Sequence, residues 1–134
     1  MSEKIVLIDG HSILNRAFFG VPPLTNSEGL HTNAVYGFLN IMFKILDEEK
    51  PDYLTVAFDR SEPTFRHQMF DAYKGTRKPM AQELREQVPV MKEVLQAMGI
   101  KIMEMPGYEA DDLLGTIAGM AEAQGMDVSI ISGD

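Results

Sequence analysis

Four short apolar segments, separated by longer segments with helical spacing, constrain the fold of this chain more than any other feature. They lie at about residues 4–9, 53–58, 100–104 and 128–131. Their near-continuous apolar character is typical of strands that are buried on both faces. Strands that alternate with helices are joined by crossover connections and form a parallel sheet. We therefore expect an α/β fold in which helices cover both faces of a central parallel sheet.

The segments between these strands carry apolar residues at helical spacing. We expect helices at about residues 11–19, 32–50 and 80–98, and a last one that begins near Ala110. In the third helix Pro89 should introduce a kink, and Gly99 is a natural stop after its last turn. Its inward-facing residues are predicted to be Leu84, Val88, Met91, Leu95 and Met98. The last helix has an apolar stripe made of Ala110, Leu113, Leu114, Ile117, Ala118 and Ala121.

The composition indicates a soluble, single-domain protein. The chain has 134 residues, of which 45% are hydrophobic and 24% are charged. It has no cysteine, which excludes disulfides and thiolate metal sites. The N-terminus does not resemble a signal peptide, and no apolar run approaches the roughly 18 residues of a membrane helix. We expect a cytoplasmic protein that has no contact with a membrane.

Acidic residues follow every predicted strand. Asp9, Asp59 and Asp134 each close a strand, and Glu109, Asp111 and Asp112 follow the third. In an open parallel sheet, ligands bind beyond the carboxyl ends of the strands. A single acid at such a position is equally well explained as a loop starter or a helix cap, but four strands with the same ending favour a shared site. Carboxylate oxygens without cysteine indicate Mg²⁺ or Mn²⁺.

The basic residues are distributed unevenly. A net charge of −8 argues against a nucleic-acid partner. Residues 60–78, however, contain five of the chain's 12 basic side chains and only two acids. The five are Arg60, Arg66, Lys74, Arg77 and Lys78. This segment is either a solvated basic face or a surface that contacts phosphate.

Several motifs together resemble one family, and the resemblance extends over essentially the whole chain. The motifs are Asp9-Gly10-His11-Ser12 with Arg16, Pro22-Pro23, Ala57-Phe58-Asp59, Thr64-Phe65-Arg66, Tyr73-Lys74-Gly75-Thr76-Arg77, Glu109-Ala110-Asp111-Asp112 and Ser132-Gly133-Asp134. They are similar to motifs of the 5′-nuclease family of bacterial DNA polymerase I, which is related to flap endonucleases. The resemblance implies a three-layer PIN-like fold. It also implies a structure-specific nuclease, acting in DNA replication and repair, that hydrolyses phosphodiesters near 5′ ends, at nicks and at flaps.

The resemblance also implies roles for individual residues. Two divalent ions, Mg²⁺ or Mn²⁺, would be held by Asp9, Asp59, Glu109, Asp111, Asp112 and Asp134. Lys74 and Arg77 would be the catalytic basic groups of a helical arch at about residues 60–80. DNA would be bound by Arg16, Arg66, Tyr73, Lys74, Arg77 and Lys78. The three histidines, His11, His31 and His67, are expected to be structural or solvated.

Relatives in this family continue beyond the position of Asp134 with further metal acids and a motif that grips duplex DNA. We therefore expect residues 1–134 to be the N-terminal part of a nuclease domain, incomplete at its C-terminus, whose parent chain also carries a polymerase domain. For the isolated chain we expect little activity, and the alternative is a catalytically incomplete fragment that binds metal or DNA weakly. A dehalogenase-like phosphatase is disfavoured because it needs a second aspartate where His11 stands.

Overall fold

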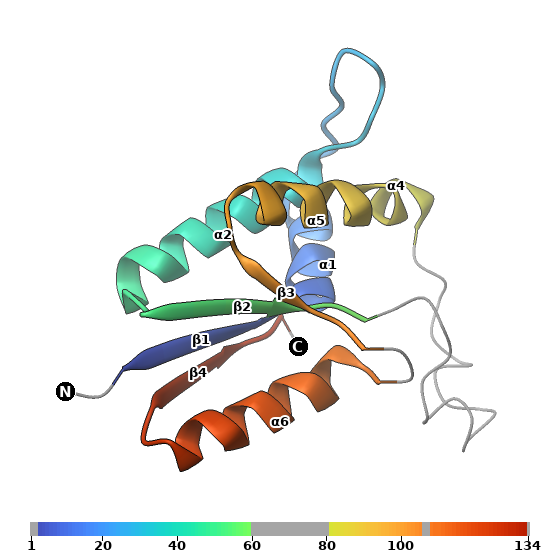
Figure 1. The fold of residues 1–134 in the computed structure, drawn as a ribbon. Helices are drawn as coiled ribbons and strands as arrows, with labels where there is room; N and C mark the ends of the chain where they lie inside the picture. The colour runs from blue at the N-terminus through green and yellow to red at the C-terminus, as the bar shows by residue number, and fades with distance from the viewer. Residues whose placement is uncertain (1–2, 60–80, 106–107, 134) are drawn as a thin grey trace.

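The computed structural model describes residues 3–59, 81–105 and 108–133 (Figure 1). Within these residues, strands and helices alternate along the chain. The elements are β1 (Lys4–Asp9), α1 (Gly10–Gly20), α2 (Asn33–Glu49), β2 (Tyr53–Ala57), α4 (Gln82–Arg85), α5 (Gln87–Ala97), β3 (Lys101–Met103), α6 (Ala110–Ala123) and β4 (Asp127–Ile131).

The four strands form one parallel sheet in the order β3-β2-β1-β4. The longest and most buried strand, β1, lies between β2 and β4, with Asp9 paired to Ala57 and Ile8 paired to Ile131. The carboxyl ends of β1, β2 and β4 therefore meet at one edge of the sheet. The predicted α/β class and parallel sheet are confirmed, and each strand lies within a few residues of its predicted position.

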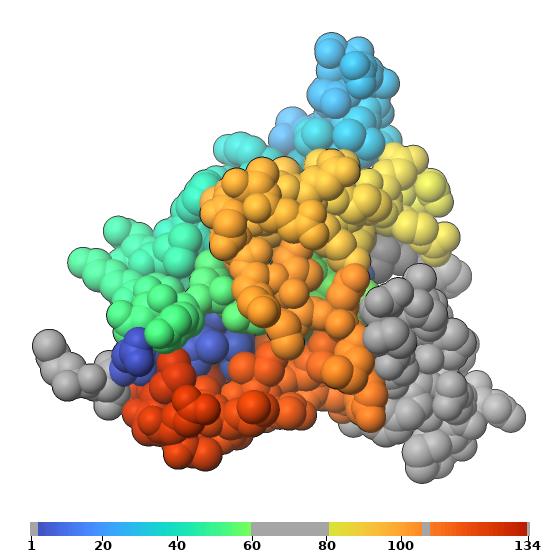
Figure 2. Space-filling view, viewed as in Figure 1, coloured from blue at the N-terminus to red at the C-terminus, as the bar shows by residue number. Residues whose placement is uncertain are grey.

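Helices cover both faces of the sheet, so that the fold has three layers (Figure 1). On one face α1, α2 and α5 enclose the larger core, whose fully buried members include Phe38, Met42 and Met91. On the other face α6 packs through Leu113 and Leu114 against a smaller core. Figure 2 shows α5 and α6 on opposite sides of the strands. None of the helices described is long and apolar enough to cross a membrane.

The third predicted helix is interrupted near Pro89, where a kink was predicted. It is divided into α4 and α5 at Glu86, three residues before Pro89. The reason is that a proline lacks an N–H and its ring clashes with the carbonyl four residues earlier. Met98 was predicted to face inward, and this prediction is wrong. Its side chain is 42% exposed because it lies at the C-cap of α5, directly before Gly99, which ends the helix at φ 76°.

A neutral polar cluster fixes the helices of the larger layer to each other. The fully buried Gln87 of α5 accepts hydrogen bonds from the N–H groups of Ala34 (2.7 Å) and Val35 (3.1 Å) in the first turn of α2. Its amide group donates to Asn33 Oδ1 at 2.9 Å. Asn33 in turn donates to the carbonyl of Phe18 at 3.0 Å, near the end of α1. Gln87 and Asn33 therefore connect α1, α2 and α5.

Candidate metal site at the carboxyl edge of the sheet

Asp9 lies where β1 ends and α1 begins. Its carboxylate accepts a hydrogen bond from the Ser12 N–H at 3.2 Å, so that it caps α1, and only 6% of the residue is exposed. The turn depends on Gly10, because a Cβ at this position would lie 2.6 Å from the Phe58 ring and 2.9 Å from the Ala57 carbonyl. The close approach of α1 to β2 therefore places the Asp9 carboxylate at the sheet edge.

Asp59 follows β2 and connects this strand to α6. Its Oδ1 atom accepts a hydrogen bond from the Ala110 N–H, the first of α6, at 2.6 Å. Its own N–H donates to His11 Nδ1 at 3.0 Å. The His11 ring packs edge-on against Phe58, with the centroids 5.3 Å apart. His11 is thus a structural residue that fixes the backbone of a predicted metal acid, in agreement with its predicted role.

The first turn of α6 carries the remaining predicted acids of the described residues. Glu109 is the N-cap and is buried, whereas Asp111 is exposed. Asp112 accepts a hydrogen bond from the Glu109 N–H at 3.2 Å, and the two residues form a capping box. Two of these acids therefore stabilise the N-terminal end of α6.

The carboxyls of Asp59, after β2, and Asp111, in α6, lie near enough to Asp9, at the end of β1, to affect its pKa. The pKa of Asp9 is raised from 3.8 to about 7. Burial is the largest cause, and the neighbouring carboxyls of Asp111 and Asp59 raise the pKa further, against the lowering effect of the Ser12 N–H. Negative charge is thus concentrated at the position where the sequence predicts a cation.

The chemistry of these side chains fits a hard divalent cation, because all the candidate donors are carboxylate oxygens. Their present geometry supplies only part of a coordination sphere. Among the described residues, no three acidic or histidine side chains are grouped closely enough to hold a metal ion. Asp59 and Asp112 accept backbone hydrogen bonds at the helix end instead.

Most of the predicted DNA-contacting residues lie outside the described residues. Arg16 is described and is exposed on α1. The others, which include both predicted catalytic groups, belong to residues 60–80, and the predicted metal ligand Asp134 is also not described. The outside residues are Arg66, Tyr73, Lys74, Arg77, Lys78 and Asp134, together with His67.

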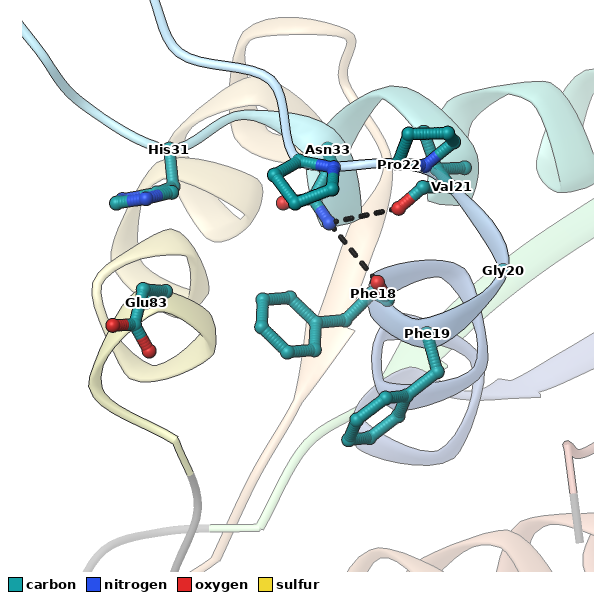
Figure 3. Close-up of a pocket in the computed structure, with 9 residues that line it drawn as sticks. Phe18, Phe19, Gly20, Val21, Pro22, His31, Asn33 and Glu83 are labelled. Atoms are coloured by element: carbon teal, nitrogen blue, oxygen red, sulfur yellow. Dashed lines mark hydrogen bonds between the residues drawn. The ribbon is translucent and has the colours of Figure 1, made fainter.

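A cavity of about 620 Å³ lies near the other end of α1 and was not predicted from the sequence. Figure 3 shows Phe18, Phe19 and Val21 along one side, and His31 and Glu83 opposite them. The side chain of Asn33 points between the carbonyls of Phe18 and Val21, to which it donates hydrogen bonds (Figure 3). Of the predicted metal acids that the structure describes, none lines this cavity.

Comparison with known proteins gives consistent matches. The profile of the family described as "5'-3' exonuclease, N-terminal resolvase-like domain" matches residues 4–134. DNA polymerase I of Bacillus caldotenax is 52% identical over 134 residues, and that of Bacillus subtilis is 50% identical over 132. These matches cover 100% and 98% of the chain but only 15% of each polymerase. A 5'-3' exonuclease of Aquifex aeolicus is 42% identical over 132 residues, and the chain spans 46% of it.

Solved structures of a bacteriophage T5 protein have the same fold. A T5 5'-exonuclease structure with bound zinc ions matches with a TM-score of 0.71 at 20% identity. A T5 D15 flap endonuclease, described as a pseudo-enzyme-product complex with DNA and metal ions, matches with a TM-score of 0.69 at 20% identity. Both matches cover 98% of the chain and 49% of the T5 protein. At this identity the likeness establishes the fold, which confirms the predicted PIN-like architecture.

Proposed function

The chain belongs to the family of 5'-3' exonuclease N-terminal, resolvase-like domains, and on this premise we propose that it hydrolyses DNA phosphodiesters at 5′ ends, nicks and flaps with the help of bound divalent cations. The observation that carries the proposal is that Asp9 ends β1 and Asp59 follows β2 at the carboxyl edge of the sheet, where the Asp59 carboxylate accepts a hydrogen bond from the first N–H of α6. The raised pKa of the buried Asp9 reflects its burial first and then the neighbouring carboxyls of Asp111 and Asp59. A buried carboxylate beside other carboxylates is costly unless a cation or a proton compensates its charge.

The proposed ligands of Mg²⁺ or Mn²⁺ are these three residues together with Glu109, Asp112 and Asp134. When bound, a pair of such ions supplies an activated water and stabilises the leaving oxygen of a phosphodiester. The acids hold the ions, and for this Asp59 and Asp112 would exchange their backbone hydrogen bonds for metal contacts. The metal ions bound in the T5 structures support a metal site in this fold.

The basic side chains would bind the substrate. Lys74 and Arg77 would neutralise the charge that develops on the phosphate during hydrolysis. The proposed phosphate contacts are Arg16, Arg66 and Lys78, and Tyr73 would stack beside the cleaved strand. Because relatives named DNA polymerase I contain this region, we further propose that the nuclease acts on branched or nicked DNA beside a polymerase domain, in replication and repair.

A second candidate function is weak binding of a cation and DNA without turnover. It is favoured by the absence of a three-ligand group among residues 3–59, 81–105 and 108–133. In this case the ions would bind but would not be held as a catalytic pair. The two candidates differ in whether the chain cleaves DNA, and not in whether it binds metal.

A cleavage assay distinguishes them. A 5′-labelled flap oligonucleotide is incubated with the chain at pH 8, with Mg²⁺ or Mn²⁺ and with EDTA. We expect cleavage that needs the cation and that Asp111→Asn reduces by about tenfold or more, as the loss of a metal ligand does. Asp127→Asn is the matched control, because Asp127 is exposed at the start of β4, on the opposite edge of the sheet.

Cleavage that persists in EDTA, or that Asp111→Asn leaves unchanged, would contradict the proposed nuclease site. No cleavage combined with saturable Mn²⁺ binding would support the second candidate.

A further inference from the structure

Phe58 contacts the turns that carry both Asp9 and Asp59. It is the residue directly before Asp59 and is fully buried. Its N–H donates a hydrogen bond to the carbonyl of Met103 at 2.9 Å, which continues the hydrogen bonding between β2 and β3 beyond Ala57. The backbone from which Asp59 departs is therefore fixed to the neighbouring strand.

The ring of Phe58 packs against the start of α1, immediately after Asp9. A Cβ atom at Gly10 would lie 2.6 Å from this ring, so α1 comes as close to β2 as a residue without a side chain allows. The ring of His11 packs edge-on against the same ring, with the centroids 5.3 Å apart and the ring planes at 82°. One side chain thus contacts the two residues that follow Asp9.

His11 connects the ring of Phe58 to the backbone of Asp59. Its Nδ1 atom accepts a hydrogen bond from the Asp59 N–H at 3.0 Å. The position of the His11 ring therefore determines the direction in which the N–H of Asp59 points. Because the His11 ring packs on Phe58, a shift of the Phe58 ring would move His11 and, with it, the backbone of Asp59.

A cation from α5 also contacts the Phe58 ring. The Nζ atom of Lys92 lies 5.3 Å from the ring centroid, within the distance of a cation–π contact. The same ammonium group donates a hydrogen bond to Glu104, directly after β3, at 2.8 Å. Together with Gly10 and His11, Lys92 limits the positions that the Phe58 ring can take.

From these contacts we propose that Phe58 is a positioning residue for the metal site, where it sets the separation of the carboxyls of Asp9 and Asp59. The inference rests on the proposed function, because it gives both aspartates the role of metal ligands. Phe58 has no polar side-chain atom with which to bind an ion, so it acts only through its neighbours. Metal ligands must be held within about 0.5 Å of their working geometry, and a ring shared by both turns provides this restraint.

The test compares Phe58→Leu with the unmodified 134-residue chain, with Mn²⁺ as the probe and calorimetry as the measurement. Outer contacts that orient metal ligands change metal affinity by about 10- to 100-fold when they are removed. Leucine keeps part of the buried volume but has no ring to contact Gly10 and His11. We therefore expect Phe58→Leu to weaken Mn²⁺ binding by about tenfold, at the lower end of this range.

Phe38→Leu is the matched control. Phe38 is also fully buried and belongs to the same core as Phe58, so the same truncation should reduce stability in a similar way. It lies in α2, which carries none of the predicted metal acids. We expect Phe38→Leu to leave Mn²⁺ binding unchanged. Urea unfolding of both variants measures the loss of stability, so that a loss of affinity confined to Phe58→Leu identifies a loss of positioning.

His11→Ala tests the same connection at a side chain that is 19% exposed, where truncation disturbs the core less. It removes the acceptor of the Asp59 N–H and should also weaken Mn²⁺ binding by about tenfold. In the double variant with Phe58→Leu, the combined loss should be smaller than the product of the two single losses, because Phe58 acts on Asp59 through His11. If Phe58→Leu does not fold, His11→Ala decides the test by itself.

Equal Mn²⁺ binding by Phe58→Leu and Phe38→Leu, normal binding by His11→Ala, or fully independent losses in the double variant would each overturn the inference and leave the proposed function intact. If Asp9→Asn and Asp59→Asn both bind Mn²⁺ normally, the proposed metal site itself fails, and the role of Phe58 fails with it.

Discussion

Two polar clusters, each with a buried member, lie at opposite ends of α1, and they differ in how their charges are balanced. At the C-terminal end, Gln87 and Asn33 are 0% and 2% exposed, and neutral donors and acceptors satisfy them. At the N-terminal end, Asp9 is 6% exposed and faces the carboxyls of Asp111 and Asp59. The first cluster is complete as it stands. The second is complete only when a proton or a cation compensates its charge, which is the property expected of a binding site.

The comparison teaches that burial of polar groups does not by itself indicate function. A satisfied neutral cluster stabilises the arrangement of helices, and its loss should reduce stability without any effect on metal binding. A cluster of like charges destabilises the metal-free chain, and its loss should affect metal binding most. Variants at the C-terminal end of α1 should therefore change mainly the stability, whereas variants at the N-terminal end should change mainly the metal binding.

The largest expected effect is on stability and comes from the neutral cluster. Gln87→Leu leaves the N–H groups of Ala34 and Val35 and the Oδ1 atom of Asn33 without their partner. We expect a loss of about 3 kcal/mol in the free energy of unfolding, since buried unsatisfied groups cost roughly 1–3 kcal/mol each. Urea unfolding measures it.

The matched control is Gln96→Leu, which makes the same change at an exposed position of α5. A loss of stability no greater than that of the control, or a change in Mn²⁺ binding by Gln87→Leu, would remove the distinction between the two clusters.

A smaller effect is expected on the pH dependence of stability. The pKa of Asp9 is about 7 in the folded chain and is raised from 3.8, so the folded state binds this proton more tightly than the unfolded state. Its stabilising contribution is fully present below about pH 4 and is lost as the pH rises through 7. In EDTA, the unmodified chain should therefore lose more stability between pH 5 and pH 8 than Asp9→Asn does.

Asparagine at position 9 can still cap α1 through its side-chain oxygen, so the comparison isolates the charge. Urea midpoints at the two pH values provide the measurement. If stability changes with pH in the same way for the two proteins, charge repulsion at Asp9 does not lower the stability of the folded chain.

The sequence predicted the sheet well because the information for it is local. Each strand is a short apolar run, and parallel connection follows from the helices between the runs. The same reasoning predicts that the acids at the strand ends lie near one another, and the carboxyls of Asp111 and Asp59 do raise the pKa of Asp9. The outward position of Met98 was missed because periodicity does not show where the last turn of a helix ends.

The contacts that organise the site could not be predicted, because they join distant parts of the chain. Asp59 contacts Ala110 and His11, and neither contact leaves a local pattern. Gln87 did leave a signal, since it lies three residues after Leu84 and four before Met91, on the apolar stripe. A polar residue at such a position indicates a buried hydrogen-bonding group.

The central claim is that the acids at the carboxyl edge bind a divalent cation, and calorimetric titration of Mn²⁺ into the metal-free chain at pH 8 tests it most directly. At this pH the Asp9 carboxyl, with a pKa of about 7, is mostly ionised. We predict saturable binding that Asp9→Asn and Asp111→Asn each weaken by about tenfold or more, and that Lys74→Ala leaves unchanged. The absence of binding, or binding that neither aspartate variant weakens, would contradict the account.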